Sequence, residues 1–152
     1  MIRISSRAEL LNCFRPIDRD QVQLPTDITF PFALKNFASW LEPSGHRAYL
    51  VFERPDGNPA GVSFQRMVGS SDAAPAMCQW CNKVAGGSDV SLMTATASPS
   101  RFVGVHLCSD IKCGQEEART PGVNDLRESL DKSQRILRIL SRMNDFAKIN
   151  LF

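Results

Sequence analysis

The chain has 152 residues and a mass of 16.9 kDa, and its residues are 43% hydrophobic and 22% charged. This length and composition allow one domain with a sizeable core, which excludes a disordered protein. The 18 basic and 16 acidic residues leave a formal charge of +2, too balanced for wholesale electrostatic binding to nucleic acid or an anionic membrane. There is neither an apolar run of the roughly 18 residues of a membrane span nor an apolar signal-peptide core. We therefore expect a soluble, cytoplasmic protein that binds no membrane.

The N-terminal part is expected to be a short lead-in with little regular structure. Ser6 is placed to cap a turn of helix over residues 8–11, because a serine hydroxyl accepts hydrogen bonds from the free N–H groups at a helix start. Pro16 would end that helix, since proline cannot continue one. The alternation in Gln21–Leu24 predicts a short strand. The apolar residues between 34 and 41 have a helix-like or irregular spacing.

Two β-hairpins are predicted in the middle of the chain. The first pairs the β-rich run 48–53 with the alternating run 60–66, across a turn that contains Asp-Gly. The second pairs residues 90–94 with residues 102–107, and the small and polar residues 95–100 form its loop. Antiparallel hairpins rather than parallel strands are therefore expected to dominate the sheet.

A long amphipathic helix is predicted at the C-terminal end, over residues 123–147. Asn124 or Asp125 is suited to cap its start. Its expected apolar stripe consists of Leu126, Leu130, Leu137, Leu140 and Met143, widened by Ile136 and Ile139.

Four of the five cysteines form two close pairs, Cys78/Cys81 and Cys108/Cys113, whereas Cys13 stands alone. An odd number of cysteines without a signal peptide argues against a secreted disulfide framework. Zinc needs four ligands at tetrahedral corners, and a C-x2-C or C-x4-C spacing lets one turn of backbone supply two thiolates. The four paired cysteines are therefore predicted to hold one structural zinc ion.

The 26 residues between the two pairs have room for a β-hairpin that returns the chain to the first pair. If the second pair opens a helix within residues 108–119, the free N–H groups of that helix support the thiolate charge. Zinc at +2 with four thiolates at −4 leaves −2, which Lys83 and Lys112 are placed to moderate. Four protein ligands leave no open position for an activated water, which argues against zinc catalysis.

A zinc knuckle at the first cysteine pair, a β-hairpin and a helix at the second pair are together the elements of a treble-clef zinc finger. The predicted fold class is α+β, with antiparallel β-hairpins, a treble-clef zinc finger and a C-terminal amphipathic helix. We expect a single domain over residues 1–152, divided into a lead-in (1–28), a β-rich part (29–76), the zinc finger (77–119) and the C-terminal helix (123–147).

Other interpretations of these residues stay open at the level of sequence. A C-x2-C pair also occurs in dithiol redox sites, although no thioredoxin-like βαβ pattern surrounds this one. His106 alternates onto the face of Cys108 and competes as a ligand. Cys13 is expected to be a small buried side chain rather than a ligand or a nucleophile. No phosphate-binding loop, nucleophile elbow or H-E-x-x-H motif occurs, so neither an enzyme activity nor a small-molecule substrate is predicted.

Three segments carry a family resemblance, namely Met77–Asn82, Val90–Met93 and Val103–Cys113. In this order they resemble the C-terminal treble-clef zinc finger of the elongation factor G-binding (FBP, FusB-type) family. The stretch Trp40–Arg66 is similar to the strands that precede the zinc knuckle in that family, and the resemblance covers about residues 8–118. It implies that the metal ligands are Cys78, Cys81, Cys108 and Cys113.

The resemblance also implies a partner. The better-known members of the family bind elongation factor G and help to free ribosomes stalled by fusidic acid. Those members carry an additional N-terminal helical bundle, which we do not expect in this chain. The expected partner is therefore elongation factor G, with the ribosome or rRNA as further possibilities.

The leading functional interpretation is a zinc-binding protein-interaction module that acts on elongation factor G or the translating ribosome. The candidate contact residues are Gln79, Trp80, Arg101 and Phe102. Ordinary core packing is the alternative role of Trp80 and Phe102. The alternative function is that of a nucleic-acid (rRNA)-binding zinc finger. Such a protein would use the basic residues Arg101, Arg119, Arg127, Arg135, Arg138 and Arg142.

Overall fold

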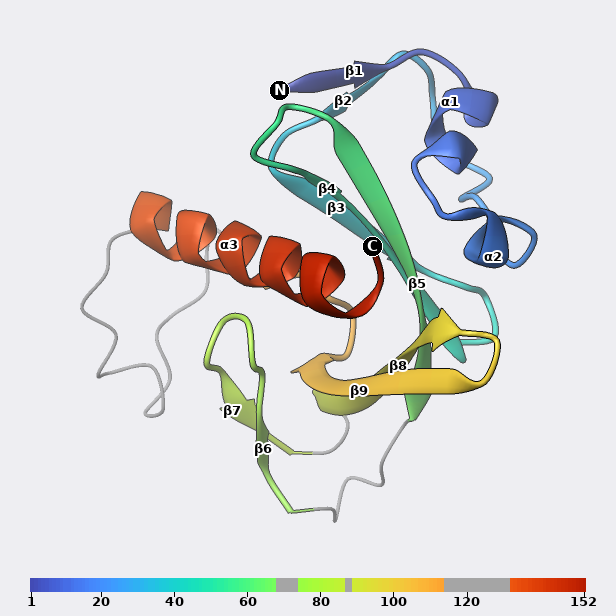
Figure 1. Cartoon of the computed structure of the whole chain (residues 1–152). Helices are drawn as coiled ribbons and strands as arrows, with labels where there is room; N and C mark the ends of the chain where they lie inside the picture. The colour runs from blue at the N-terminus through green and yellow to red at the C-terminus, as the bar shows by residue number, and fades with distance from the viewer. Residues whose placement is uncertain (68–73, 87–88, 114–131) are drawn as a thin grey trace.

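The computed structural model describes residues 1–67, 74–86, 89–113 and 132–152 (Figure 1). In chain order its elements are β1 (Ile2–Ile4), α1 (Arg7–Asn12), α2 (Pro16–Arg19), β2 (Phe32–Leu34), β3 (Phe37–Leu41), β4 (Arg47–Glu53), β5 (Pro59–Met67), β6 (Ala76–Met77), β7 (Val84–Ala85), β8 (Val90–Ser98), β9 (Arg101–Cys108) and α3 (Lys132–Asn150). The predicted α+β class with antiparallel sheets and a C-terminal helix is confirmed.

The centre of the fold is a five-stranded antiparallel sheet with the strand order β3-β4-β5-β8-β9. Strand β4 is buried over five consecutive residues, which is expected of a strand covered on both faces. Because successive side chains of a strand point to opposite faces, Leu50 and Phe52 enter one core whereas Tyr49 and Val51 enter another. Figure 1 shows α3 on one side of β4 and β5, and the α1–α2 segment on the other.

The larger of the two cores lies on the side of the sheet that α3 covers, and we call it the helix-side core. It is built from the sheet, from α3 and from the cysteine pairs. Its largest buried side chains are Phe37, Leu50, Phe52, Phe64, Trp80, Met93, Leu107, Ile111, Ile139 and Met143.

The smaller core joins the other face of β4 to the first 34 residues, and we call it the N-terminal core. It contains Ile4, Leu10, Phe14, Leu34, Tyr49 and Val51. Ser6 caps α1 as predicted, since its Oγ accepts a hydrogen bond from the backbone N–H of Glu9 at 3.1 Å.

Two predictions for the N-terminal part are wrong. The first helix ends at Asn12, and Pro16 opens α2 rather than ending α1, because proline suits the first helical position. Residues 21–24 are not a strand, since the carbonyl groups of Gln21 and Gln23 accept hydrogen bonds from side chains instead of a neighbouring strand. The donors are the Tyr49 hydroxyl, at 2.8 Å, and the Trp40 indole, at 2.7 Å.

The region 34–41 is also extended rather than helix-like. It contains the end of β2 and the whole of β3, and the left-handed backbone of Asn36, with φ 66°, separates the two strands. Strand β3 pairs with β4 from Phe37↔Phe52 to Leu41↔Ala48. The ladder to β4 thus determines the conformation of a run whose own apolar spacing does not favour a strand.

Both predicted hairpins are present, but the second is longer than expected. Strand β8 continues to Ser98 and β9 begins at Arg101, so most of the predicted loop 95–100 belongs to the sheet. A register shift between Thr96 and Ser98 accommodates the extra residue. The predicted loop was therefore too long because small and polar residues occupy the end of β8.

Helix α3 runs to Asn150, beyond the predicted end at 147. Its buried stripe is Ile139, Met143 and Ala147, whereas Leu137 is 66% exposed. Leu137 precedes Ile139 by two residues, about 200° around the helix, so it points away from the core. The predicted cap at residues 124–125 and the first part of the predicted stripe lie outside the described residues. None of the described helices is long and apolar enough to cross a membrane.

Candidate metal centre

The structure brings the four paired cysteines together. One sulfur atom from each of Cys78, Cys81, Cys108 and Cys113 lies within 4.8 Å of all the others, and none of the four is in a disulfide. The Sγ–Sγ distances are 3.6 Å between Cys78 and Cys113 and 3.5 Å between Cys81 and Cys108. Four sulfurs each about 2.3 Å from a tetrahedral zinc ion would be about 3.8 Å apart. The cluster therefore fits one structural zinc ion.

The first knuckle is a small hairpin formed by β6 and β7, whose register is Ala76↔Ala85 and Met77↔Val84. The N–H of Asn82 donates to the carbonyl of Cys78 at 2.9 Å, and the N–H of Cys78 donates to the carbonyl of Lys83 at 2.7 Å. Asn82 has a φ of 67°, a left-handed conformation that asparagine tolerates better than most residues. This turn brings Cys78 and Cys81 to the same side of the hairpin.

The second knuckle follows directly from the end of β9. The N–H of Ile111 donates to the carbonyl of Cys108 at 2.8 Å, and Ile111 itself is left-handed, with a φ of 55°. The side chain of Asp110 accepts a hydrogen bond from the N–H of Lys112 at 3.1 Å. Residues 109–113 thus form a turn, and residues 114–119, the rest of the segment in which a helix start is predicted, lie outside the described residues.

Two side chains from distant parts of the chain hold the knuckles in place. Ser39 on β3 donates from its Oγ to the carbonyls of Asp110, at 2.9 Å, and Ile111, at 3.2 Å. Arg142 on α3 donates to the first knuckle. The prediction from sequence missed both residues, because no spacing signal connects them to the cysteines.

Burial and electrostatics agree with a closed structural centre. The residues Cys78, Cys108 and Cys113 are all less than 7% exposed. Hydrogen bonds among the four sulfurs, from Cys108 first and then Cys113, lower the pKa of the Cys78 and Cys81 thiols, and the pKa of the Cys108 and Cys113 thiols is raised in turn. A thiolate is the form of cysteine that binds metal. Since four protein sulfurs fill a tetrahedral shell, the site has a structural and not a catalytic design.

The positions of His106 and Cys13 in the fold decide the roles that the sequence left open for them. His106 is exposed on β9 and is not among the side chains that converge on the cluster. Cys13 lies in the N-terminal part, partly buried, and burial raises the pKa of its thiol to about 11. Its Sγ donates to the carbonyl of Glu9 at 3.4 Å. Cys13 is therefore a protonated packing residue, close to the predicted role.

The four predicted contact residues lie in different environments. Gln79 is exposed, and its backbone N–H and side-chain oxygen pair with the carbonyl and N–H of His106, at 2.9 and 3.0 Å. Trp80 is 3% exposed and contacts the rings of Phe64 and Phe146, so it belongs to the core. Arg101 and Phe102 are exposed at the start of β9, and Phe102 retains 65% of its accessible surface. Core packing is thus the correct alternative for the tryptophan but not for the phenylalanine.

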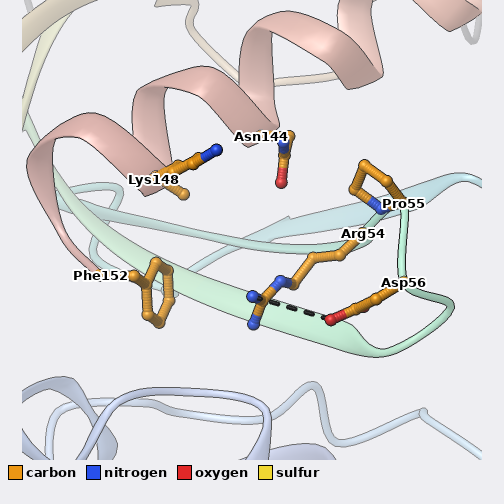
Figure 2. Close-up of a pocket in the computed structure, with 7 residues that line it drawn as sticks. Arg54, Pro55, Asp56, Asn144, Lys148 and Phe152 are labelled. Atoms are coloured by element: carbon orange, nitrogen blue, oxygen red, sulfur yellow. Dashed lines mark ion pairs between the residues drawn. The ribbon is translucent and has the colours of Figure 1, made fainter.

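A separate pocket of about 260 Å³ lies between the β4–β5 turn and the end of α3, and none of the four clustered cysteines lines it (Figure 2). Two of its charged groups, Arg54 and Asp56, already have structural partners. Arg54 is 3.9 Å from Asp56 and lies over the ring of Phe152, 5.6 Å from its centroid. A backbone hydrogen bond from Asn58 and the nearby arginine hold the pKa of Asp56 below its ordinary value. This carboxyl group is therefore ionised at neutral pH and supplies no acid proton.

Comparison with known proteins agrees with this geometry. A solved structure described as the fusidic acid resistance protein FusC is similar, with a TM-score of 0.51 at 20% sequence identity, over 84% of this chain and 56% of that one. This chain thus spans a little over half the length of FusC, and the likeness concerns the fold. No curated protein matches the sequence. The family model for the FBP C-terminal treble-clef zinc-finger matches residues 5–149. Because this match covers nearly the whole chain, the protein belongs to the FBP C-terminal treble-clef zinc-finger family.

Proposed function

We propose that this protein is a zinc-stabilised interaction module that binds elongation factor G, alone or on the translating ribosome. Membership of the FBP zinc-finger family supports this partner. The closed four-cysteine centre supports a structural use of the metal, because no coordination position remains for a reacting water. The protein acts by binding rather than by catalysis.

The proposed contact surface is one end of the sheet, on the face opposite the helix-side core. We call it the outer face and define it by Met67, Leu92, Phe102 and Gly104. Met67 pairs with Leu92 across β5 and β8, and the register of β8 with β9 places Phe102 and Gly104 on the same face. The N-terminal core covers the neighbouring part of this face, over β4. The outer face continues the same side of the sheet beyond this covered part, and the described residues leave it exposed.

The observation that carries the proposal is the exposure of the large apolar side chains on the outer face. Phe102 is 65% exposed, Met67 is 54% exposed and Leu92 is 38% exposed. A grouped set of exposed apolar side chains is typical of a protein–protein contact, and an aromatic side chain in such a group is a common anchor. Gln79 lies next to β9 and Arg101 lies at its start, and both supply a polar rim to the proposed contact surface.

Calorimetric titration of the zinc-loaded protein with purified elongation factor G tests the proposal. Phe102→Ala should weaken binding about tenfold or more, the range expected for loss of an aromatic anchor. Leu137→Ala is the matched control, because Leu137 is equally exposed, at 66%, but lies on α3. The control variant should bind like the unmodified protein. Equal binding by both variants would remove the outer face from the proposal.

The titration is repeated with ribosomal RNA at two salt concentrations to test the nucleic-acid alternative. Binding through phosphate contacts falls steeply as salt rises. Of the basic residues of this alternative, Arg142 already donates to the first knuckle. Strongly salt-dependent RNA binding without detectable binding to elongation factor G would overturn the proposal.

A further inference from the structure

Arg142 connects α3 to the first knuckle, 60 to 63 residues away in sequence. Its Nη1 atom donates to the carbonyl of Gln79 at 3.0 Å and to the carbonyl of Trp80 at 3.2 Å. The same nitrogen lies 2.8 Å from the side-chain oxygen of Asn82. All three acceptors belong to the loop that carries Cys78 and Cys81.

The position of these acceptors makes the contact relevant to the metal. Gln79 and Trp80 are the two residues between the ligands of the first pair, and Asn82 directly follows the second ligand. Zinc with four thiolates carries a formal charge of −2, so a neighbouring guanidinium also provides electrostatic compensation. Arginine is suited to this task because it presents several N–H donors in a fixed planar arrangement and stays charged.

An apolar contact accompanies the polar one. The ring of Trp80 packs against Phe146 of α3 with 6.0 Å between ring centroids. Ile139 and Met143, on either side of Arg142 along the helix, are each 1% exposed. The first knuckle is thus held to α3 by hydrogen bonds on its carbonyl groups and by ring packing at its centre. The conformation of the metal loop and the docking of the helix depend on each other.

We propose that Arg142 is a positioning residue of the zinc centre and that it couples zinc binding to the docking of α3. In the docked state, Arg142 fixes the loop between Cys78 and Cys81 in the conformation that ligates zinc. In the reverse direction, bound zinc fixes the acceptors on which Arg142 docks. Such coupling is reciprocal, because two linked binding equilibria affect each other by the same factor.

The first test measures zinc affinity by competition with a chromophoric chelator. Arg142→Met removes the donors and the charge but keeps much of the apolar stem, and it should lower zinc affinity by about tenfold or more, as observed for partners outside the ligand set. Arg142→Lys keeps the charge and should give an intermediate loss. The matched control is Arg135→Met, an arginine of the same helix two turns earlier. A merely structural role would lower thermal stability in Arg142→Met while zinc affinity stays unchanged, and that result would overturn the proposal.

The second test follows the helix rather than the metal, by amide hydrogen exchange in the zinc-loaded proteins. Arg142→Met should speed exchange of α3 and of the first knuckle together, while exchange of the N-terminal core stays as in the unmodified protein. Because the metal remains bound, this measurement does not depend on the metal-free protein staying folded. Faster exchange of α3 with an unchanged knuckle would show that the helix and the metal loop are not coupled and would overturn the proposal.

Discussion

The two cores of this protein share strands β3 and β4 but are closed in different ways. On one face of the sheet, the helix-side core contains three of the four clustered cysteines among its buried residues, and α3 covers it. On the other face, the N-terminal core is closed by aromatic packing, with Phe14 edge-on to both Trp40, at 6.0 Å, and Tyr49, at 6.3 Å. One core therefore includes the cysteine centre that joins distant segments, whereas the other is closed by packed side chains.

Direct contact between backbone segments also joins the lead-in to the sheet in the N-terminal core. The N–H of Gly61 donates to the carbonyl of Cys13 at 2.7 Å, and Phe14 forms a bridge with the same glycine. A Cβ atom at position 61 would lie 2.8 Å from the ring of Phe14, which is closer than two carbon atoms can pack. The absence of a side chain on Gly61 thus allows the lead-in to lie directly on β5. This comparison predicts that the two cores respond differently to metal removal and to mutation.

Loss of a metal ligand should have the largest effect. Cys108→Ser is expected to abolish stoichiometric zinc binding and to lower the free energy of unfolding by more than about 4 kcal/mol, the range in which loss of a metal falls. Elemental analysis and urea unfolding measure the two quantities. Hydrogen exchange should show the loss mainly in α3, β6 and β7. Equal loss of protection in the N-terminal core would mean that the two cores are a single unit.

Truncation of the aromatic centre of the N-terminal core should come next. Phe14→Ala leaves a cavity at a side chain that is 1% exposed, and it should cost about 3–5 kcal/mol of unfolding free energy. Zinc content should remain at one ion per chain, since the metal lies on the other face. Phe102→Ala is the control because that phenylalanine is exposed, and its cost should stay within about 0.5 kcal/mol. Zinc loss from Phe14→Ala would contradict the independence of the two cores.

Removal of one buried hydroxyl should have a smaller effect. The Tyr49 hydroxyl donates to the carbonyl of Gln21 at 2.8 Å, and this bond holds the irregular segment before β2. Tyr49→Phe keeps the ring and should cost about 1 kcal/mol, the typical net value of such a bond. Thermal unfolding monitored by circular dichroism would detect the loss. No change in stability would indicate that water replaces the hydroxyl as the partner of Gln21.

Cys13 should show the smallest effect of the cysteines. Cys13→Ser is expected to change the unfolding free energy by about 1 kcal/mol or less and to leave the zinc content unchanged, in contrast to Cys108→Ser. Because burial raises the pKa of Cys13 to about 11, only about 0.1% of it is thiolate at pH 8, and its alkylation by iodoacetamide should be slow. The rate should rise about tenfold per pH unit between pH 8 and 10. Rapid labelling at pH 8 would contradict the raised pKa.

The metal centre was predictable from the sequence because its ligands follow a local spacing rule. Two close cysteine pairs around a hairpin are specified by residues near one another in the chain, and the turn at Asp56-Gly57 marks the first hairpin in the same way. The cap at Ser6 is also a local signal. These features therefore agree between sequence and structure.

Features that depend on tertiary contacts were not predictable in this way. Strand β3 is extended because of its ladder to β4, and residues 21–24 are irregular because Trp40 and Tyr49 hold their carbonyl groups. The roles of Ser39 and Arg142 follow from contacts over about 60 to 70 residues of sequence. Trp80 lies between two metal ligands, in a loop where the sequence suggests an exposed contact residue, but the rings of Phe64 and Phe146 bury it. Side chains that join distant segments leave no periodic pattern.

The hydrogen bonds between Gln79 and His106 have a consequence for self-association. Strand β9 is the last strand of the sheet, and an outermost strand with free N–H and C=O groups is a template onto which another chain can add. Gln79 occupies both main-chain groups of His106, and it does so from the loop that zinc organises. Removal of the metal is therefore expected to free these two main-chain groups of β9, as well as to lower the stability of the fold. A chelated sample should consequently form β-rich aggregates through β9, at concentrations where the zinc-loaded protein stays dispersed.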